Sequence, residues 1–100
     1  MVTLFGGRER AILGSYIASG EDHTAVMVSP RSLFTGALGL DAHSLLLAHN
    51  HPSGDCRPSA ADKIVTDMVR AHAAIFGIEV IDHLIFTEDR CFSMQRGELL

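Results

Sequence analysis

Basic side chains are scarce in this chain of 100 residues, and its charge balance is acidic. Eight Lys and Arg residues stand against 12 Asp and Glu residues, which gives a formal net charge of −4 at pH 7. The basic residues form no run of the kind that follows a phosphate backbone. The charge pattern therefore does not support nucleic acid as a partner.

Cysteine is also scarce, and long apolar runs are missing. Cys56 and Cys91 are the two cysteines and lack C-x-x-C spacing, so they fit a reducing compartment better than a disulfide scaffold. No apolar run approaches the length of a membrane span, and the first ten residues, MVTLFGGRER, lack the charged-then-apolar order of a signal peptide. These absences predict a soluble cytoplasmic protein with no membrane partner.

Apolar residues are plentiful, at 47% of the chain, and occur in short blocks. This length allows one domain with a modest core. No linker or internal repeat divides the chain, so we expect a single α/β domain over residues 1–100, with a mixed β-sheet flanked by helices. The blocks predict strands over residues 2–5, 11–19, 24–28, 44–48, 78–87 and 91–94, and helices over residues 29–40 and 58–76.

Local signals support three of these elements. Ser29 and Pro30 suit the N-cap and first position of a helix, and Gly77 suits a left-handed helix stop. The run over residues 44–48, SLLLA, is short and continuously apolar, which predicts a strand buried on both faces. This strand leads directly to His49.

Residues 49–62, HNHPSGDCRPSAAD, form a polar loop in an otherwise apolar chain. Because residues two apart on a strand share a side, His49 and His51 can direct both imidazoles to one point. Asp62, in the first turn of the next helix, can return a carboxylate to that point. Two imidazoles and one carboxylate leave a tetrahedral position open for water, as in catalytic zinc sites. Ser59 could turn its hydroxyl toward a developing oxyanion.

Each half of this loop also has an ordinary structural explanation. A pair of the form H-x-H occurs by chance in surface turns, and Ser59 with Asp62 can be explained as a helix cap. The likeness of the letters HNH to a nuclease motif is a coincidence, because the other ligand spacings and the basic surface of a nuclease are missing. The metal site is the better explanation of the two halves together, since a cap does not need two adjacent histidines.

The run His49-x-His51-Pro52, six residues, Ser59-x-x-Asp62 resembles the H-x-H-P-x6-S-x-x-D signature of the JAMM (JAB1/MPN+) zinc metalloproteases. Its fuller wording, with Pro30-Arg31 upstream and IDHLIF over residues 81–86, is similar to the RadC-like JAB branch. The resemblance implies one Zn²⁺ held by His49, His51 and Asp62, with Ser59 as the catalytic residue that steadies the water or oxyanion. It also implies a fold similar to cytidine deaminases, with a curved sheet between helices.

The resemblance further implies hydrolysis of a peptide or isopeptide bond in a peptide or protein substrate. The family's general base is a glutamate at the start of the strand that corresponds to residues 2–5, and we expect this glutamate to lie upstream of the sequence. Glu9 and Glu21 come after that strand and do not match. The competing hypothesis is a catalytically inactive zinc-binding module. Such a module would recognise a protein partner or would act in recognition related to DNA repair.

Four further features carry weaker expectations. Cys56 is either an exposed thiol without a role or a thiolate that modulates the zinc site. Asp82 and His83 have either a supporting role, orienting a ligand histidine, or a packing role at the end of a strand. A shortened first strand would leave an open sheet edge, which favours a homodimer.

Overall fold

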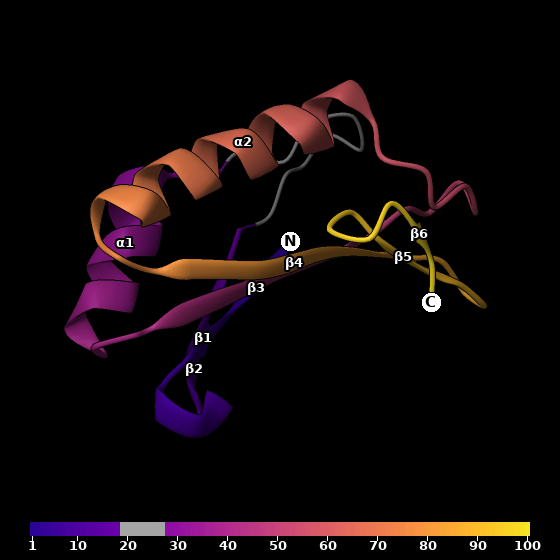
Figure 1. Cartoon of the computed structure of the whole chain (residues 1–100). Coiled ribbons are helices and arrows are strands. Elements are labelled where there is room, and N and C mark those ends of the chain that lie inside the picture. Colours follow the sequence, from indigo (N-terminus) through magenta and orange to yellow (C-terminus); the bar gives the residue numbers. More distant parts are fainter. Residues whose placement is uncertain (19–27) are drawn as a thin grey trace.

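One mixed sheet forms the frame of the computed structural model, which describes residues 1–18 and 28–100 (Figure 1). Within these residues the strand order is β2-β1-β3-β4-β5-β6, with β3 parallel to β4 and the other pairs antiparallel. The strands are β1 (Val2–Gly6), β2 (Ile12–Ile17), β3 (Ser44–Asn50), β4 (Glu79–Phe86), β5 (Cys91–Ser93) and β6 (Glu98–Leu99); the helices are η1 (Arg8–Arg10), α1 (Pro30–Gly39) and α2 (Ala60–Ile75).

The predicted fold class is confirmed, and both long helices lie where the sequence predicts them. The Ser29 hydroxyl caps α1 by accepting from the Ser32 backbone N–H, and Pro30 is the first helical residue. Gly77 ends α2 with φ +68°, a left-handed conformation that favours glycine. The predicted strand over residues 24–28 lies outside the described residues, except for Val28, which is in no regular element. The short β6 was not predicted.

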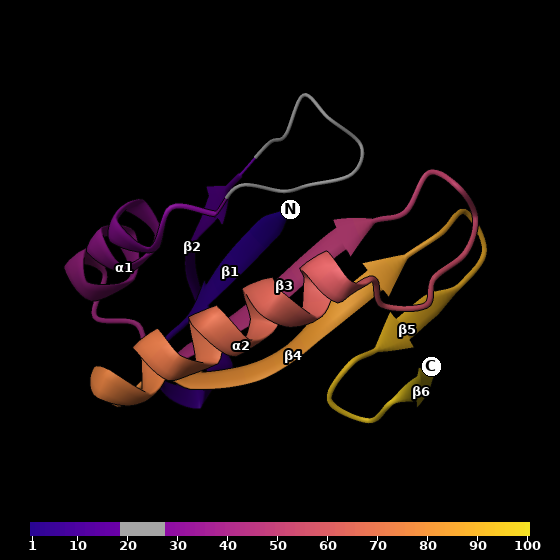
Figure 2. The ribbon, with the colours of Figure 1, turned by 90° about the horizontal axis from the view of Figure 1, so that it is seen from above.

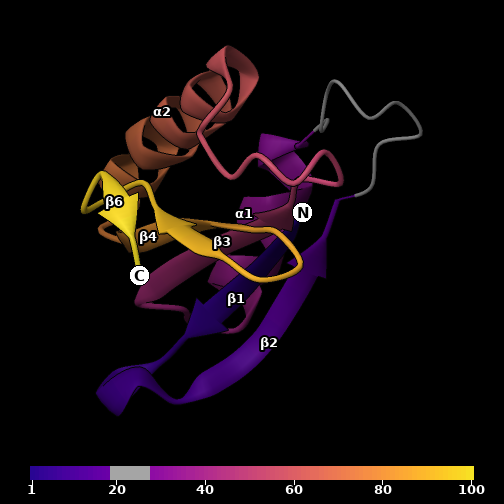
Figure 3. The ribbon, with the colours of Figure 1, turned by 90° about the vertical axis from the view of Figure 1, so that its right-hand side faces the viewer.

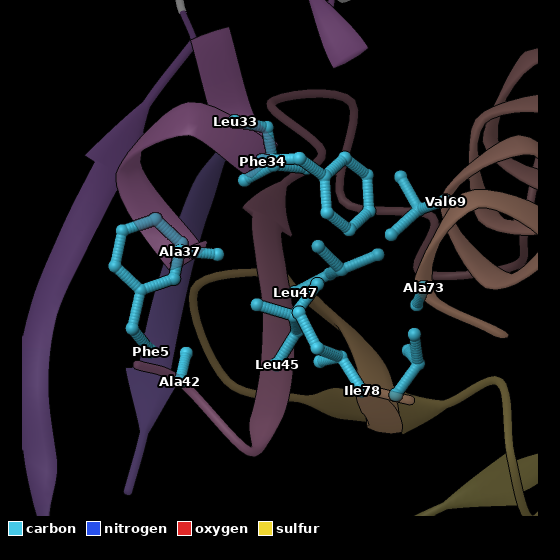
Figure 4. Close-up of a cluster of buried hydrophobic side chains, with 11 residues drawn as sticks. Phe5, Leu33, Phe34, Ala37, Ala42, Leu45, Leu47, Val69, Ala73 and Ile78 are labelled. Carbon is cyan, nitrogen blue, oxygen red and sulfur yellow. The ribbon is translucent and has the colours of Figure 1, made fainter. Parts of the chain in front are cut away.

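Helices α1 and α2 pack against the same face of the sheet. Phe5 of β1 pairs with Leu45 of β3, and Leu45 pairs with Val80 of β4, so their side chains share a face. α2 runs along β3 and β4, while α1 lies toward β1 and β2 (Figure 2). The two helices and three strands fill one buried cluster (Figure 4): Phe5, Leu33, Phe34, Ala37, Ala42, Leu45, Leu47, Val69, Ala73, Ile78 and Val80.

The opposite face of the sheet is less covered. Leu45 and Leu47 are fully buried, whereas Leu46 and Ala48, which alternate with them along β3, are only partly buried. The prediction that this strand is buried on both faces is therefore wrong, because within the described residues the helices cover one face. None of the described helices is long and apolar enough to cross a membrane.

An irregularity in β4 sets which of its side chains face the helices. Leu45 pairs with Val80 but Leu46 pairs with Asp82, so Ile81 is an extra residue in the ladder. This bulge changes the alternation along β4. As a result Val80, His83 and Ile85 are buried on the helix face, and Asp82 lies on the other.

Candidate metal centre

The candidate site lies where β3 ends and α2 begins, at the end of the sheet that faces the viewer in Figure 3. His49 is the next residue after Leu47 on the helix face of β3. The backbone N–H of His51 still bonds to the Phe86 carbonyl of β4 at 2.8 Å, so the strand geometry continues past Asn50. Both imidazoles therefore point to the same side, toward the N-terminus of α2.

The structure brings His49, His51 and Asp62 together. One ligand atom from each lies within 4.8 Å of the others, so the group could hold a metal ion. The Nε2 atoms of the two histidines are 2.9 Å apart, His49 Nε2 is 3.0 Å from Asp62 Oδ1, and His51 Nε2 is 3.1 Å from Asp62 Oδ2. A tetrahedral ion with bonds of about 2.0–2.1 Å spaces its ligand atoms by roughly 3.3 Å. These three residues fit such an ion after shifts of a few tenths of an ångström.

Asp62 is held in place by the first turn of α2. Its Oδ2 accepts from the Ser59 backbone N–H at 2.8 Å, while its own backbone N–H donates to the Ser59 hydroxyl oxygen at 3.1 Å. Burial alone would raise the pKa of the Asp62 carboxyl, but the Ser59 N–H, the two imidazoles and the Ser59 hydroxyl together lower it below its ordinary value. The side chain is therefore an anion, as a metal ligand must be.

His51 is oriented by the loop that follows it. Its Nδ1 lies 2.8 Å from the Asp55 carbonyl oxygen, which can only accept a hydrogen bond. In the neutral ring the proton therefore sits on Nδ1, and Nε2 presents its lone pair to the site. The Arg57 guanidinium and backbone N–H bond to the Asp55 carboxylate and hold its pKa near 2.

His49 is oriented from within the protein core. Its Nδ1 lies 2.8 Å from His83 Nε2, and His83 Nδ1 lies 2.5 Å from the Thr66 hydroxyl oxygen. His83 is 1% exposed, and burial together with the adjacent His49 lowers the pKa of its imidazole to about 4. Burial also lowers the pKa of His49. Both rings are neutral at pH 7.

Thr66 has no place in the sequence-based prediction. The buried residues of α2 are Asp62, Thr66, Val69 and Ala73, which form one stripe at helical spacing. A hydroxyl on this stripe, one turn after the candidate ligand, is the sequence signal that could have identified it. The other side chains of this stripe beyond Asp62 are apolar.

The remaining predicted site residues have different surroundings. Ser59 is exposed and caps α2 while its own hydroxyl proton stays available, so its catalytic role stays a prediction. Cys56 is 6% exposed, which makes the expectation of an exposed thiol wrong, and its role as a modulator stays a prediction. The Asp82 carboxylate accepts from the Ser93 hydroxyl and from the backbone N–H groups of His83 and Gln95. It therefore holds the end of β5 and the turn that follows it, rather than a ligand histidine.

Of the two glutamates that do not match the family's general base, Glu9 is among the described residues and Glu21 is not. Val2 pairs with Ala48, and Gly6 pairs with Ser44, so β1 runs away from the candidate site. Glu9 follows β1 and lies at the far end of the sheet, as expected for a residue that is not the base. Glu21 lies outside the described residues.

Comparisons with known proteins point to one family. A family model described as the RadC-like JAB domain matches residues 1–99. A UPF0758 protein from Pelodictyon phaeoclathratiforme is 41% identical over 76% of this chain and 34% of its own length. UPF0758 proteins from Chlorobium chlorochromatii and Chlorobaculum parvum are 38% and 36% identical, over 93% and 100% of this chain and 41% and 45% of their own lengths. The chain thus spans less than half the length of these curated relatives.

Proposed function

Because this chain belongs to the RadC-like JAB domain family, we propose that it is a metal-dependent hydrolase domain that cleaves peptide or isopeptide bonds. The observation that carries the proposal is the convergence of two imidazoles and one carboxylate within 4.8 Å. Zn²⁺ is the proposed ion, since a set of two histidines and one carboxylate is typical of catalytic zinc. The peptide or protein substrate, the cytoplasmic location and the homodimer remain predictions.

The residues around the centre support hydrolysis in distinct ways. A bound ion supplies Lewis acidity, which polarises a carbonyl and acidifies water. The Ser59 hydroxyl oxygen accepts from the Asp62 N–H, so its proton is free to donate to the oxyanion that develops at the scissile carbonyl. The capping role and the proposed catalytic role of Ser59 are therefore compatible.

The described residues do not supply a general base for the proposed hydrolysis. Asp62 is the only carboxylate that they place in the group, and it is committed as a ligand. The Val2–Ala48 pair sets residue 1 opposite His49. We propose that a carboxylate reaches the site either from a segment joined to the amino side of Met1 or from another chain, because that position adjoins the ligand histidines.

The competing function is a zinc-binding module that recognises a protein partner without hydrolysis. The lack of a described base in the group favours it. The acidic net charge of −4 argues against the version with a DNA-repair-related nucleic-acid partner.

Metal content tests the site itself. Protein purified without chelators should hold about one zinc ion per chain, measured by elemental analysis, and the double variant His49→Ala/His51→Ala should hold none. His43→Ala, which removes a half-exposed imidazole at the opposite end of β3, is the matched control and should keep its zinc. Equal zinc in the double variant and the wild type would refute the centre.

Hydrolysis is tested separately. The coding sequence is read upstream of Met1, and the protein with any upstream segment is assayed on isopeptide-linked and linear fluorogenic peptides. We expect cleavage that a chelator abolishes, and loss of cleavage when an upstream glutamate is changed to glutamine. Zinc binding without cleavage in every form of the protein would favour the non-hydrolytic module.

A further inference from the structure

A buried chain of hydrogen bonds runs from the candidate metal centre to the backbone of α2. His49 Nδ1 contacts His83 Nε2 at 2.8 Å, His83 Nδ1 contacts the Thr66 hydroxyl at 2.5 Å, and that hydroxyl lies 2.8 Å from the Asp62 carbonyl oxygen. We propose that His83 and Thr66 form a hydrogen-bond relay with two arrangements, which satisfies either tautomer of His49 when the centre gains or loses its ion. The inference rests on the proposed metal site.

The first arrangement fits the metal-free protein. His49 carries its proton on Nε2, where Asp62 Oδ1 at 3.0 Å and His51 Nε2 at 2.9 Å both accept. This leaves a lone pair on His49 Nδ1, which accepts from His83 Nε2–H. The remaining lone pair, on His83 Nδ1, accepts from the Thr66 O–H. Every proton in the chain then has an acceptor.

The second arrangement fits a centre that holds an ion. His49 Nε2 must then present a lone pair, so the His49 proton sits on Nδ1 and is donated to His83 Nε2. His83 in turn carries its proton on Nδ1 and donates it to the Thr66 oxygen. The Thr66 hydroxyl rotates and donates to the Asp62 carbonyl oxygen. The two rings and the hydroxyl hold three protons in both arrangements. Each ring changes tautomer by losing the proton of one nitrogen to water and gaining a proton from water at the other, so the net charge does not change and no proton has to pass through Thr66.

Thr66 gives His83 Nδ1 a hydrogen-bond partner in both arrangements. A hydroxyl can donate to His83 Nδ1 or accept from it, because it is both donor and acceptor and its hydrogen rotates. A backbone carbonyl in its place would fix one tautomer, as the Asp55 carbonyl does for His51. His51 therefore serves as an internal reference whose tautomer does not change.

Replacing Thr66 by valine should affect the two arrangements unequally. In the metal-free arrangement it leaves one lone pair of His83 without a donor. In the metal-bound arrangement it leaves a buried N–H of His83 without an acceptor, and a buried donor left unsatisfied is strongly disfavoured. We expect zinc affinity to fall about 10- to 100-fold, the usual effect of losing a residue that supports a metal ligand. Thr66→Ser keeps the hydroxyl and should restore the affinity.

The experiment measures tautomers directly in the wild-type protein with ¹⁵N-labelled histidine. Long-range ¹H–¹⁵N spectra at pH 7.5 should show His49 and His83 protonated on Nε2 without metal and on Nδ1 after one equivalent of Zn²⁺. His51 should stay protonated on Nδ1 throughout. Zinc affinity is measured by competition with a chromophoric chelator for wild type, Thr66→Val and Thr66→Ser. Thr35→Val, at an exposed threonine of α1, is the matched control and should bind as wild type does.

The outcomes separate the relay from the proposed function. Zinc binding with unchanged His83 tautomers, or wild-type affinity in a folded Thr66→Val protein, would overturn the relay alone. Failure of the wild type to bind zinc would overturn the relay and the proposed centre together. The wild-type spectra decide the question even if Thr66→Val does not fold.

Discussion

Acid should destabilise the metal-free protein at a pH well above the range in which carboxylates titrate. The cause is His83, whose pKa falls to about 4 because it is buried beside His49. The other titratable groups whose charge acts on it are Asp62 on α2, Asp82 on its own strand, although on the other face of the sheet, and His51 at the end of β3. In the unfolded chain the same imidazole has a pKa of about 6.5.

The sign follows from proton binding. Between pH 6.5 and 4 the unfolded chain binds a proton at His83 and the folded protein does not, so the free energy of unfolding falls as the pH falls. The loss is about 1.4 kcal/mol per pH unit once the pH is well below 6.5, or about 2 kcal/mol at pH 5. It is complete near pH 4. His49 acts in the same direction, since burial lowers its pKa as well.

Asp62 acts in a lower window. Its pKa is lowered in the folded protein, so its contribution to stability is present above the unfolded value of about 3.9 and is lost below it. A fall in stability between pH 6.5 and 5 therefore reports the buried histidines and not this carboxylate.

The assay is urea unfolding followed by circular dichroism at pH 7.5, 6.5, 5.5 and 5.0, with a chelator present to keep the protein metal-free. His83→Gln cannot titrate at this position. Below pH 6 its free energy of unfolding should therefore fall with falling pH less steeply than that of the wild type, by about 1.4 kcal/mol per pH unit, whatever its stability at pH 7.5. His43→Gln, at a half-exposed imidazole, is the control and should keep the wild-type slope. If the His83→Gln and wild-type slopes agree, His83 is not held neutral by burial and the reasoning is wrong.

Two further predictions concern the core and the helix cap. Leu47→Ala removes a side chain with 0% exposure from the shared cluster, so the free energy of unfolding should fall by about 2–5 kcal/mol in urea titrations; a loss below about 1 kcal/mol would contradict the packing described. Ser59→Ala removes the cap of α2, so the free energy of unfolding should fall by about 1 kcal/mol. The variant should still hold about one zinc ion per chain, because Ser59 is not in the candidate ligand group. Loss of zinc in a folded variant would show that the cap is needed to position Asp62.

The features that the sequence predicts well are those decided by neighbouring residues. Ser29 with Pro30, and Ser59 with Asp62, act within one helical turn, so their letters are enough to place the starts of α1 and α2. The convergence of His49 and His51 is also local, because it depends only on strand alternation. In contrast, the partial exposure of Leu46 depends on which face of the sheet the helices cover, and that is decided by residues distant in the chain.

The histidine behind His49 shows why spacing alone could not complete the site. In a regular strand, Val80 and Asp82 would share a face, and the aspartate rather than His83 would face the candidate ligands. The extra residue Ile81 reverses this, because the bulge gives Val80 and His83 the same face. Nothing in the letters around residue 81 marks a bulge, since it arises from how β4 aligns with β3. The sequence could therefore name the Asp82–His83 pair but not choose between its members, and the choice decides whether His49 meets a carboxylate acceptor or a ring that can both donate and accept.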